Sequence, residues 1–288
     1  MNIQSLSVVV PNKNCINKCE FCVARMNESS KCYKNQMDEN LPFYDLYIDD
    51  YLKRLEFARD NGCNTLMLTG DSEPQQNRAF LKDFGLILRQ MKNPFKNIEM
   101  QTTGALLDKN YLRFLRNFVQ VSTISLSTSS FNENHNNEII RSPVRINYDS
   151  LCEEIKLYDF NLRLSLNMSS EFNDLSLDDI YEKANNLGAN QVTFRILYTS
   201  GTDTPQDKWI ASHPCNKSGE DITKYVESHG TFLEILPFGA KKYSVNGIAT
   251  VVDNDCMSTQ AKEDFKYLIL RPDCKLYSKW DDKASLIF

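Results

Sequence analysis

The 288-residue sequence contains no apolar run long enough to span a membrane, and its N-terminus lacks the charged and apolar regions of a signal peptide. It has no excess of positive charge either, because 33 Lys and Arg residues stand against 38 Asp and Glu residues. The resulting net charge of −5 disfavours a nucleic-acid partner. We therefore expect a cytoplasmic protein with no membrane partner.

Histidine is scarce, and the three that occur, His135, His213 and His229, do not have the spacing of metal-binding pairs. A zinc site built from histidine is therefore not expected. The length of the chain allows one large α/β domain or two small ones.

Three cysteines near the N-terminus, Cys15, Cys19 and Cys22, are separated by three and then two residues. A short loop with this spacing can direct three thiolates to one iron–sulfur cube. Because a cube has four irons, one iron is left without a protein ligand and can bind a substrate or cofactor. A zinc knuckle is the alternative, but zinc needs four ligands and no second cysteine pair follows closely.

Strand-like and helix-like segments alternate over the first two thirds of the chain. Six strand-like runs cover residues 5–10, 65–69, 98–102, 121–127, 162–167 and 191–197. Five amphipathic segments of helical length lie between them, at residues 44–61, 80–91, 107–118, 150–159 and 177–187. This order predicts an α/β fold with a parallel sheet, either an open doubly wound sheet or a partial barrel.

The polarity of the strands favours the barrel. Leucine alternates with Arg163, Ser165 and Asn167 in the fifth strand, and three other strands alternate in the same way. A parallel sheet covered on both faces would instead be apolar throughout. We therefore predict a partial (β/α)6 TIM-like barrel with a wet, ligand-binding lumen, and a solvent-exposed sheet is the alternative.

The composition changes near residue 200. Residues 199–214 are predicted to form a long loop and residues 221–228 a helix, before five strand-like pieces. Asn246-Gly247 between two β-prone runs predicts a hairpin. We therefore divide the chain into a barrel, residues 1–199, and a mostly β C-terminal extension, residues 200–288, that caps it.

The second predicted strand ends in the turn Thr69-Gly70-Asp71-Ser72-Glu73-Pro74. An ammonium group needs carbonyl oxygens or a carboxylate at close range, and a strand end can supply both. The alternative is a simple strand-to-helix turn in which Asp71 or Ser72 caps the helix.

These motifs resemble those of the radical S-adenosylmethionine (radical SAM) superfamily. The cysteine spacing and Phe21 before the third cysteine resemble its signature, and the Gly70–Pro74 turn resembles its Gly-Gly-Glu element, with Ser72 in place of the second glycine. The layout is similar to that of compact single-cluster members such as the molybdenum-cofactor cyclase and viperin-like enzymes. The resemblance implies that Cys15, Cys19 and Cys22 bind a [4Fe-4S] cluster whose open iron chelates SAM.

The resemblance also places SAM contacts at the strand ends. The implied cofactor-binding residues are Phe21, Gly70, Asp71, Ser72, Glu73, Thr102, Thr103, Ser125, Ser127, Arg141, Asn167, Arg195 and Leu197. For Arg163 and Arg195 an internal ion pair with Glu99 is an equal alternative. For Arg141 the favoured alternative is a surface position before a helix.

The implied activity is reductive cleavage of SAM to a 5′-deoxyadenosyl radical, which abstracts a hydrogen atom from a small-molecule or nucleotide substrate. The reaction class, whether oxidoreductase, transferase or lyase, stays open, and a flavodoxin or ferredoxin is the expected electron donor. Peptide or RNA modification is an alternative. A non-catalytic iron–sulfur or zinc-binding redox sensor or scaffold is an alternative of another class.

Six further cysteines are assigned more loosely. Cys63 and Cys152 lie in or beside predicted helices and are expected to be small core residues. Cys256 and Cys274, with Arg195, are candidate catalytic residues, and either cysteine could donate a hydrogen atom. No close cysteine pair occurs in the extension, which disfavours an auxiliary cluster, and Cys32 and Cys215 receive no role.

Overall fold

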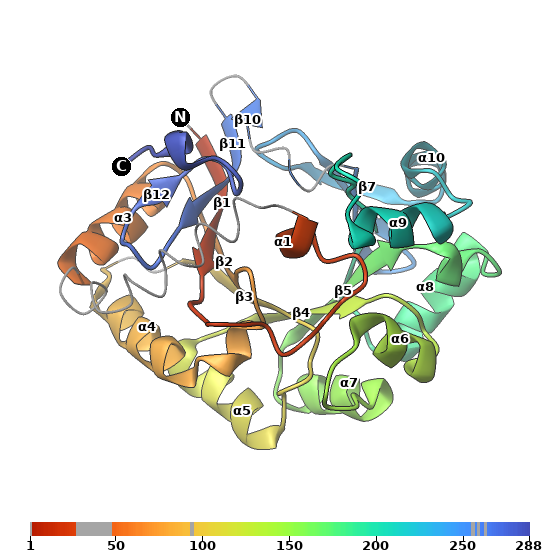
Figure 1. Ribbon diagram of the computed structural model, residues 1–288, viewed down its shortest axis with the longest axis horizontal. Coiled ribbons are helices and arrows are strands. Elements are labelled where there is room, and N and C mark those ends of the chain that lie inside the picture. The colour runs from red at the N-terminus through yellow and green to blue at the C-terminus, as the bar shows by residue number, and fades with distance from the viewer. Residues whose placement is uncertain (1, 27–47, 93–94, 255–256, 258–259, 262–263) are drawn as a thin grey trace.

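The computed structural model describes residues 2–26, 48–92, 95–254, 257, 260–261 and 264–288. A curved, mostly parallel sheet forms its centre, with helices on the outer side of the curve (Figure 1). The first six strands are β1 (Asn2–Val9), β2 (Thr65–Thr69), β3 (Asn97–Thr102), β4 (Thr123–Thr128), β5 (Asn161–Met168) and β6 (Gln191–Ile196). They lie side by side in chain order and all run parallel, which confirms the predicted strands and α/β class.

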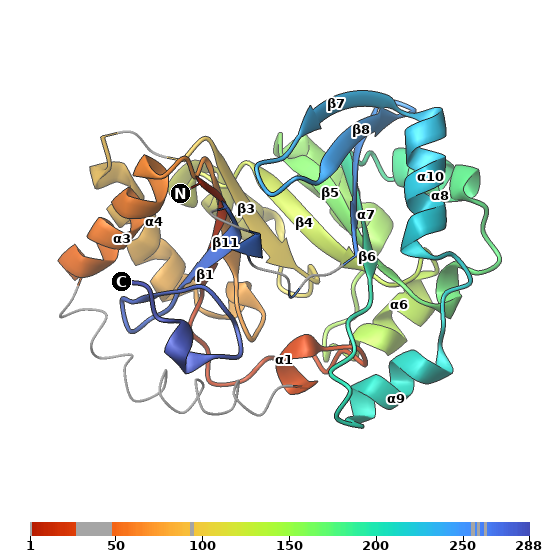
Figure 2. The same ribbon diagram turned by 90° about the horizontal axis from the view of Figure 1, so that it is seen from above.

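The extension adds strands to both edges of this sheet. β9 (Ile248–Asp253) pairs in parallel with β6, and β11 (Asp264–Leu270) pairs in parallel with β1. The flanking strands are β7 (Thr231–Ile235), β8 (Lys241–Val245), β10 (Gln260–Ala261) and β12 (Leu276–Tyr277). In the strand order of the described residues β9 and β11 are not paired, so the barrel is partial (Figure 2). The division at residue 200 stays a prediction.

The expected helices are present, with their ends shifted by a few residues where the structure describes them. The helices around the sheet are α3 (Ile48–Asp60), α4 (Arg78–Gln90), α5 (Lys109–Phe114), α7 (Tyr148–Leu157), α8 (Leu177–Asn186) and α10 (Gly219–His229). A π-helical turn, Leu115–Val119, continues α5. Residues 44–47 of the first predicted helix lie outside the described residues.

Three of the helices in the described part of the chain were not predicted: α1 (Val23–Met26), α6 (Glu133–Ile140) and α9 (Pro205–Ser212). The predicted long loop at residues 199–214 is therefore wrong over α9. This helix begins with Pro205 after a capping box in which Thr204 and Asp207 each accept from the other's backbone N–H. Its sequence has little amphipathic periodicity, so these local signals outweigh the hydrophobic pattern.

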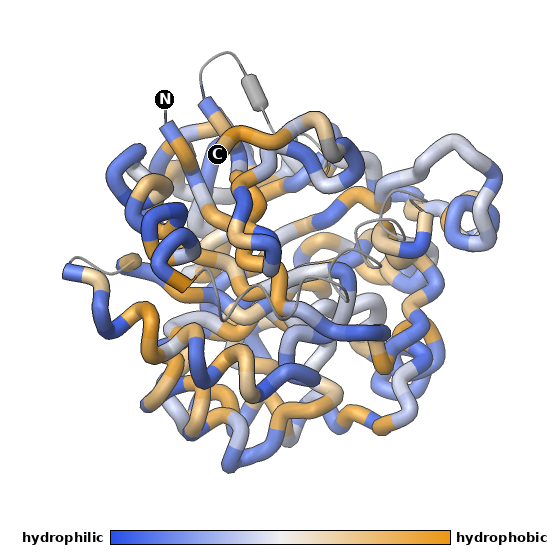
Figure 3. The backbone as a smooth tube through the Cα atoms, turned by 60° about the vertical axis from the view of Figure 1, so that its left-hand side comes forward, coloured by the Kyte–Doolittle hydropathy of each residue, from blue (hydrophilic) through white to orange (hydrophobic). Residues whose placement is uncertain are grey.

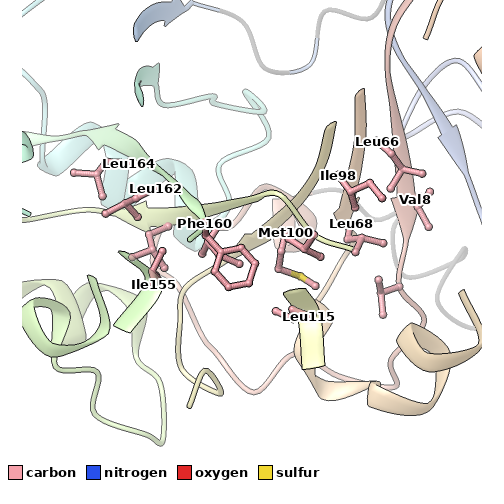
Figure 4. Close-up of a cluster of buried hydrophobic side chains, with 14 of the residues drawn as sticks. Val8, Leu66, Leu68, Ile98, Met100, Leu115, Ile155, Phe160, Leu162 and Leu164 are labelled. Atoms are coloured by element: carbon pink, nitrogen blue, oxygen red, sulfur yellow. The ribbon is translucent and has the colours of Figure 1, made fainter. Parts of the chain in front are cut away.

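One face of the sheet packs against the helices and forms the hydrophobic core. Leu162, Leu164 and Leu166 of β5 are buried in this core. In Figure 4, Ile155 of α7 lies next to Leu162, and Leu115 lies next to Met100 of β3. Hydrophobic and hydrophilic residues alternate along the surrounding helices (Figure 3). The polar residues that alternate with the leucines face the other side, which is the inside of the barrel. The predicted polar lumen is therefore present.

The predicted Asn246-Gly247 hairpin is confirmed. β8 and β9 pair antiparallel, with Val245 opposite Ile248. Asn246 and Gly247 both adopt positive φ, at 51° and 82°, as a tight turn of this kind requires. Within the described residues, no helix combines the length and the apolar character that crossing a membrane would need.

Candidate functional site

The cysteine loop lies between β1 and α1 and is fixed by contacts on both of its sides. The backbone N–H groups of Lys18 and Glu20 donate to the carbonyl oxygens of Ile140 and Ile139, at the end of α6. On the other side, the Gln76 amide accepts from Ile16 N at 2.9 Å and donates to Asn14 O at 2.8 Å. The loop is thus held by two separate parts of the barrel.

The three thiols of this loop lie close to one another. Burial raises the pKa of Cys19, and the neighbouring Cys22 and Cys15 raise it further through charge repulsion. Burial and Cys15 likewise raise the pKa of Cys22. Thiolates that repel one another in this way are stabilised when they bind a cation, so the loop suits a cluster that takes one iron per sulfur.

No set of three or more cysteine, histidine, aspartate or glutamate side chains converges on a single metal ion within the described part of the chain. A cube accepts its three thiolates on three different irons, so its ligands need not converge on one point.

Glu73 is the buried centre of the site. Its carboxylate accepts from Thr102 Oγ1 at 2.6 Å, from the N–H and hydroxyl of Thr103 at 3.0 and 2.9 Å, and from Asn17 Nδ2 at 3.2 Å. Burial raises the pKa of Glu73, and these hydrogen bonds oppose the shift. Glu73 thus connects the Gly70–Pro74 turn, the end of β3 and the cysteine loop.

The turn before Glu73 approaches β1 closely. Gly70 has φ +149°, and a Cβ built there would lie 3.3 Å from Val9 Cγ1. Ser72, which departs from the family pattern, accepts from Asn12 Nδ2 at 2.9 Å. Asn12 also donates to Glu73 O at 3.2 Å, so the residue that replaces glycine is tied to the chain just after β1.

A cavity of about 320 Å³ opens between the cysteine loop and the ends of the strands. Its walls contain the three cysteines and every predicted cofactor-binding residue except Arg141, namely Phe21, Gly70, Asp71, Ser72, Glu73, Thr102, Thr103, Ser125, Ser127, Asn167, Arg195 and Leu197. Asn17, which sequence reasoning missed, also lines it. Asn17 Oδ1 is buried and has no hydrogen-bond partner among the residues that the structure describes, so it is an acceptor suited to a group in the cavity. The residues present therefore fit a cluster and SAM.

Polar side chains of β4 and β5 form one wall of this cavity. Asn167 Nδ2 donates to Ser127 Oγ at 2.9 Å and to Ser129 Oγ at 3.2 Å. These contacts hold the amide and the hydroxyls at neighbouring strand ends, where the barrel fold gathers ligand-binding groups.

The two lumen arginines form internal ion pairs, but with different partners. Arg163 pairs with Glu99, as one of the two sequence interpretations proposed. Arg195 pairs instead with Asp253 of β9, at 3.1 Å, and its Nε donates to Ser165 Oγ. Burial lowers the pKa of Arg163, Glu99 opposes this, and the nearby Arg195 lowers it further. Both arginines line the lumen.

Arg141 lies outside the walls of the cavity. It ends α6 with φ +52° and pairs with Glu20 of the cysteine loop at 2.9 Å, with 56% of its side chain exposed. The structure therefore gives Arg141 a position beside the loop and no place against the implied SAM site.

Arg141→Gln tests this placement. An exposed ion pair contributes little, so we expect the free energy of unfolding to fall by less than about 1 kcal/mol and the SAM dissociation constant to change less than about threefold. Equilibrium unfolding and calorimetric titration of SAM measure the two quantities. A loss of SAM affinity of about a hundredfold would support the sequence interpretation instead.

Helix α9 covers the cysteine loop. The ring of Trp209 lies 6.2 Å from that of Phe21, and α9 also contacts α1 (Figure 2). Asp207 fixes the start of α9, because its carboxylate accepts from the hydroxyls of Thr204 and Ser200, both at 2.7 Å. Those hydrogen bonds lower the pKa of Asp207 below its ordinary range.

Asp207→Asn is expected to loosen α9. A carboxyl whose pKa is lower in the folded than in the unfolded protein stabilises the fold at any pH above its unfolded-state pKa. This stability is lost as the pH falls through the folded-state pKa. At neutral pH we therefore expect about 1 kcal/mol of lost cap stability, seen as about fivefold faster amide exchange in α9. In strongly acidic solution, where the wild-type carboxylate is also protonated, the two proteins should converge. Equal exchange at neutral pH would contradict the assigned cap.

The remaining cysteines are distributed as follows. Cys63 and Cys152 are buried in the hydrophobic core, as expected. Cys274 is also buried, in the turn between β11 and β12, and lines neither this cavity nor the larger one beside it. Cys32 and Cys256 lie outside the described residues, so the prediction for Cys256 stays a prediction.

Arg271 is a site residue that the sequence did not indicate. It is 2% exposed at the end of β11, lies 3.8 Å from Asp71 and donates to Trp280 O at 2.9 Å. The extension thereby contacts the turn implied to hold SAM. The signal in the sequence, an arginine directly after an apolar strand, is too common to identify such a contact.

Comparisons with known proteins agree with this geometry. The family model described as the radical SAM superfamily matches residues 9–158. A search of curated proteins finds none that matches the chain significantly.

Three solved structures share the fold. Streptococcus suis SuiB bound to S-adenosylmethionine has a TM-score of 0.55 at 11% identity, over 96% of this chain and 58% of SuiB. Native anSMEcpe with bound AdoMet has a TM-score of 0.56 at 14% identity, over 95% of this chain and 73% of that one. Escherichia coli HemN, a coproporphyrinogen III oxidase and radical SAM enzyme, has a TM-score of 0.50 at 15% identity, over 80% and 54%.

The chain thus spans less than two thirds of the length of SuiB and of HemN. At these identities the likeness concerns the fold. The family model covers more than half of the 288 residues, including the cysteine loop, the Gly70–Pro74 turn and β2 to β4. The chain therefore belongs to the radical SAM superfamily and is an enzyme of this class.

Proposed function

We propose that the protein cleaves SAM reductively at a [4Fe-4S] cluster held by Cys15, Cys19 and Cys22, and that it uses the 5′-deoxyadenosyl radical to abstract a hydrogen atom from a small-molecule or nucleotide substrate. One observation carries the proposal. The three thiols, the Gly70–Glu73 turn and the polar ends of β4 and β5 line a single cavity.

When bound, the cluster supplies an electron to SAM, and SAM supplies the radical. The protein supplies position. A cluster held by the three thiolates would keep one iron without a protein ligand, and Gly70 and Asp71 line the cavity where the SAM amino group would bind. Asn17 Oδ1, Ser127 and Asn167 offer further polar contacts.

Aromatic side chains border the site on two sides and would shield a reactive radical from solvent. The ring of Trp209 in α9 lies 6.2 Å from that of Phe21 in the cysteine loop. On the other side Trp280 and Tyr267, whose ring centroids are 6.3 Å apart, form part of the lumen wall. A flavodoxin or ferredoxin remains the proposed electron donor, and a peptide or RNA substrate remains an alternative.

The proposal is tested by product analysis. The cluster is reconstituted without oxygen, reduced with dithionite and mixed with SAM, and the products are separated by chromatography. We expect 5′-deoxyadenosine and methionine. If the protein carries a full cluster but forms neither product, the hypothesis of a non-catalytic iron–sulfur protein is favoured instead.

A further inference from the structure

A second, larger cavity of about 620 Å³ adjoins the implied SAM site. The two cavities share wall residues, among them Gly70, Asp71, Gln101 and Arg195. The larger one follows the lumen along β9 and β11, which are not paired with each other among the described residues. It extends toward the β7–β8 turn, where Phe238 N donates to Gln4 Oε1 at 3.0 Å. It therefore lies where a molecule could contact both the lumen wall and a bound SAM.

Charged side chains gather at one place in the wall of this cavity. Arg195, Lys266 and Asp253 all line it. Asp253 lies 3.1 Å from Arg195 and 2.7 Å from Lys266, so two cations of the wall lie beside this carboxylate. Arg163, which also lines the cavity, pairs with Glu99.

Arg195 has donor capacity left at this place. A guanidinium carries five N–H donors in a fixed plane. Nε donates to Ser165 and Nη1 to Asp253, whereas Nη2 makes no hydrogen bond with the residues that the structure describes. Because Arg195 lines both cavities, a ligand on Nη2 would lie at their junction.

The wall of the cavity also contains apolar and aromatic side chains. Tyr267, Ile269, Tyr277 and Val9 form a small buried cluster inside the barrel, with Met67 and Trp280 packed against it. Tyr267, Met67 and Trp280 also line the cavity. The chamber thus offers both cations and aromatic surface, as small-molecule sites with a few fixed polar groups do.

We propose that this chamber binds the substrate, and that the substrate is a small amphipathic molecule with a carboxylate or phosphate group. The anionic group binds Arg195 and Lys266, and the apolar part packs on Tyr267 and Trp280. The inference rests on the proposed function, because it places the molecule next to SAM. It adds the chemical class that this chamber selects.

The test measures binding, which does not depend on SAM cleavage. The reconstituted protein with SAM is titrated calorimetrically with benzoate, phenylphosphate and the neutral benzamide as probes. We expect an anionic probe to bind at least about tenfold more tightly than benzamide, because charged hydrogen bonds are the stronger ones. Tighter binding of phenylphosphate points to a phosphate substrate, and tighter binding of benzoate to a carboxylate.

Two variants should change the affinity for the anionic probe in opposite directions. Lys266→Met removes a cation and is expected to weaken binding about tenfold, whereas Asp253→Asn removes the competing carboxylate and is expected to strengthen it about fivefold. A merely structural ion pair would not separate the two variants in this way. The matched control is Lys275→Met, an exposed lysine outside the cavity that should keep the wild-type affinity.

Three results would overturn the inference: benzamide binding as tightly as the anions, Lys266→Met matching Lys275→Met, or no anion binding to a protein that forms 5′-deoxyadenosine. In the last case the proposed function would stand without it. If Lys266→Met and Asp253→Asn change the anion affinity in opposite directions but the protein does not cleave SAM, the anion site is supported and the proposed chemistry is not.

Discussion

Cys19→Ala is expected to abolish the cluster and lower SAM cleavage by more than about a hundredfold. Cys19 lies between the other two cysteines, and its thiol interacts with both of theirs. Changes to groups that merely support a ligand typically cost 10- to 100-fold, so loss of a ligand should cost at least as much. Iron content, the visible absorption of the cluster and 5′-deoxyadenosine formation provide the measurements.

Cys215→Ala is the matched control. Cys215 is also free and half-buried, but it lies away from the cavity. This variant should retain iron and activity. A Cys19→Ala protein that keeps a full cluster would refute the assigned ligand set, and iron loss in Cys215→Ala would show that the cysteine loop is not the only requirement.

Glu73→Ala is expected to lower the free energy of unfolding by about 3–5 kcal/mol and to reduce SAM affinity strongly. The large cost arises because Thr102, Thr103 and Asn17 would lose the buried acceptor that they share. Glu73→Gln keeps one carbonyl oxygen and should lose less stability. Denaturant unfolding of the iron-free proteins separates this effect from cluster loss.

The control for Glu73 is Glu182→Ala on the exposed face of α8, which should change stability by less than about 0.5 kcal/mol. If Glu73→Ala unfolds at the wild-type denaturant concentration, Glu73 does not hold the turn, β3 and the cysteine loop together. Normal stability with lost SAM affinity would instead give the carboxylate a direct role in binding.

Local patterns in the sequence predicted much of the fold. The alternation of Leu162, Leu164 and Leu166 with polar residues identified the two faces of β5, because side chains in a strand alternate with a period of two. Asn246-Gly247 identified its hairpin because few residue pairs accept positive φ twice. Helix α9 was missed because its capping signals, Thr204 and Asp207, lie in a stretch rich in turn-forming residues.

Contacts between distant segments could not be predicted in this way. Arg195 pairs with Asp253, 58 residues later, because β9 joins the sheet beside β6, and nothing local specifies that pairing. Arg271 reaches Asp71 because β11 returns to β1. The barrel fold was enough to predict that the site residues lie at strand ends. The ion-pair partners of each charged group instead depend on how the C-terminal extension adds strands to both edges of the six-stranded sheet.

The most direct test of the account is electron paramagnetic resonance of the reduced cluster, with and without SAM. The proposed function requires an open iron beside the cavity that we propose binds SAM, so adding SAM should change the spectrum of the wild-type protein. Arg141→Gln should show the same change, because Arg141 lies outside the cavity. An unchanged spectrum, in a protein with a full and reduced cluster, would contradict the account.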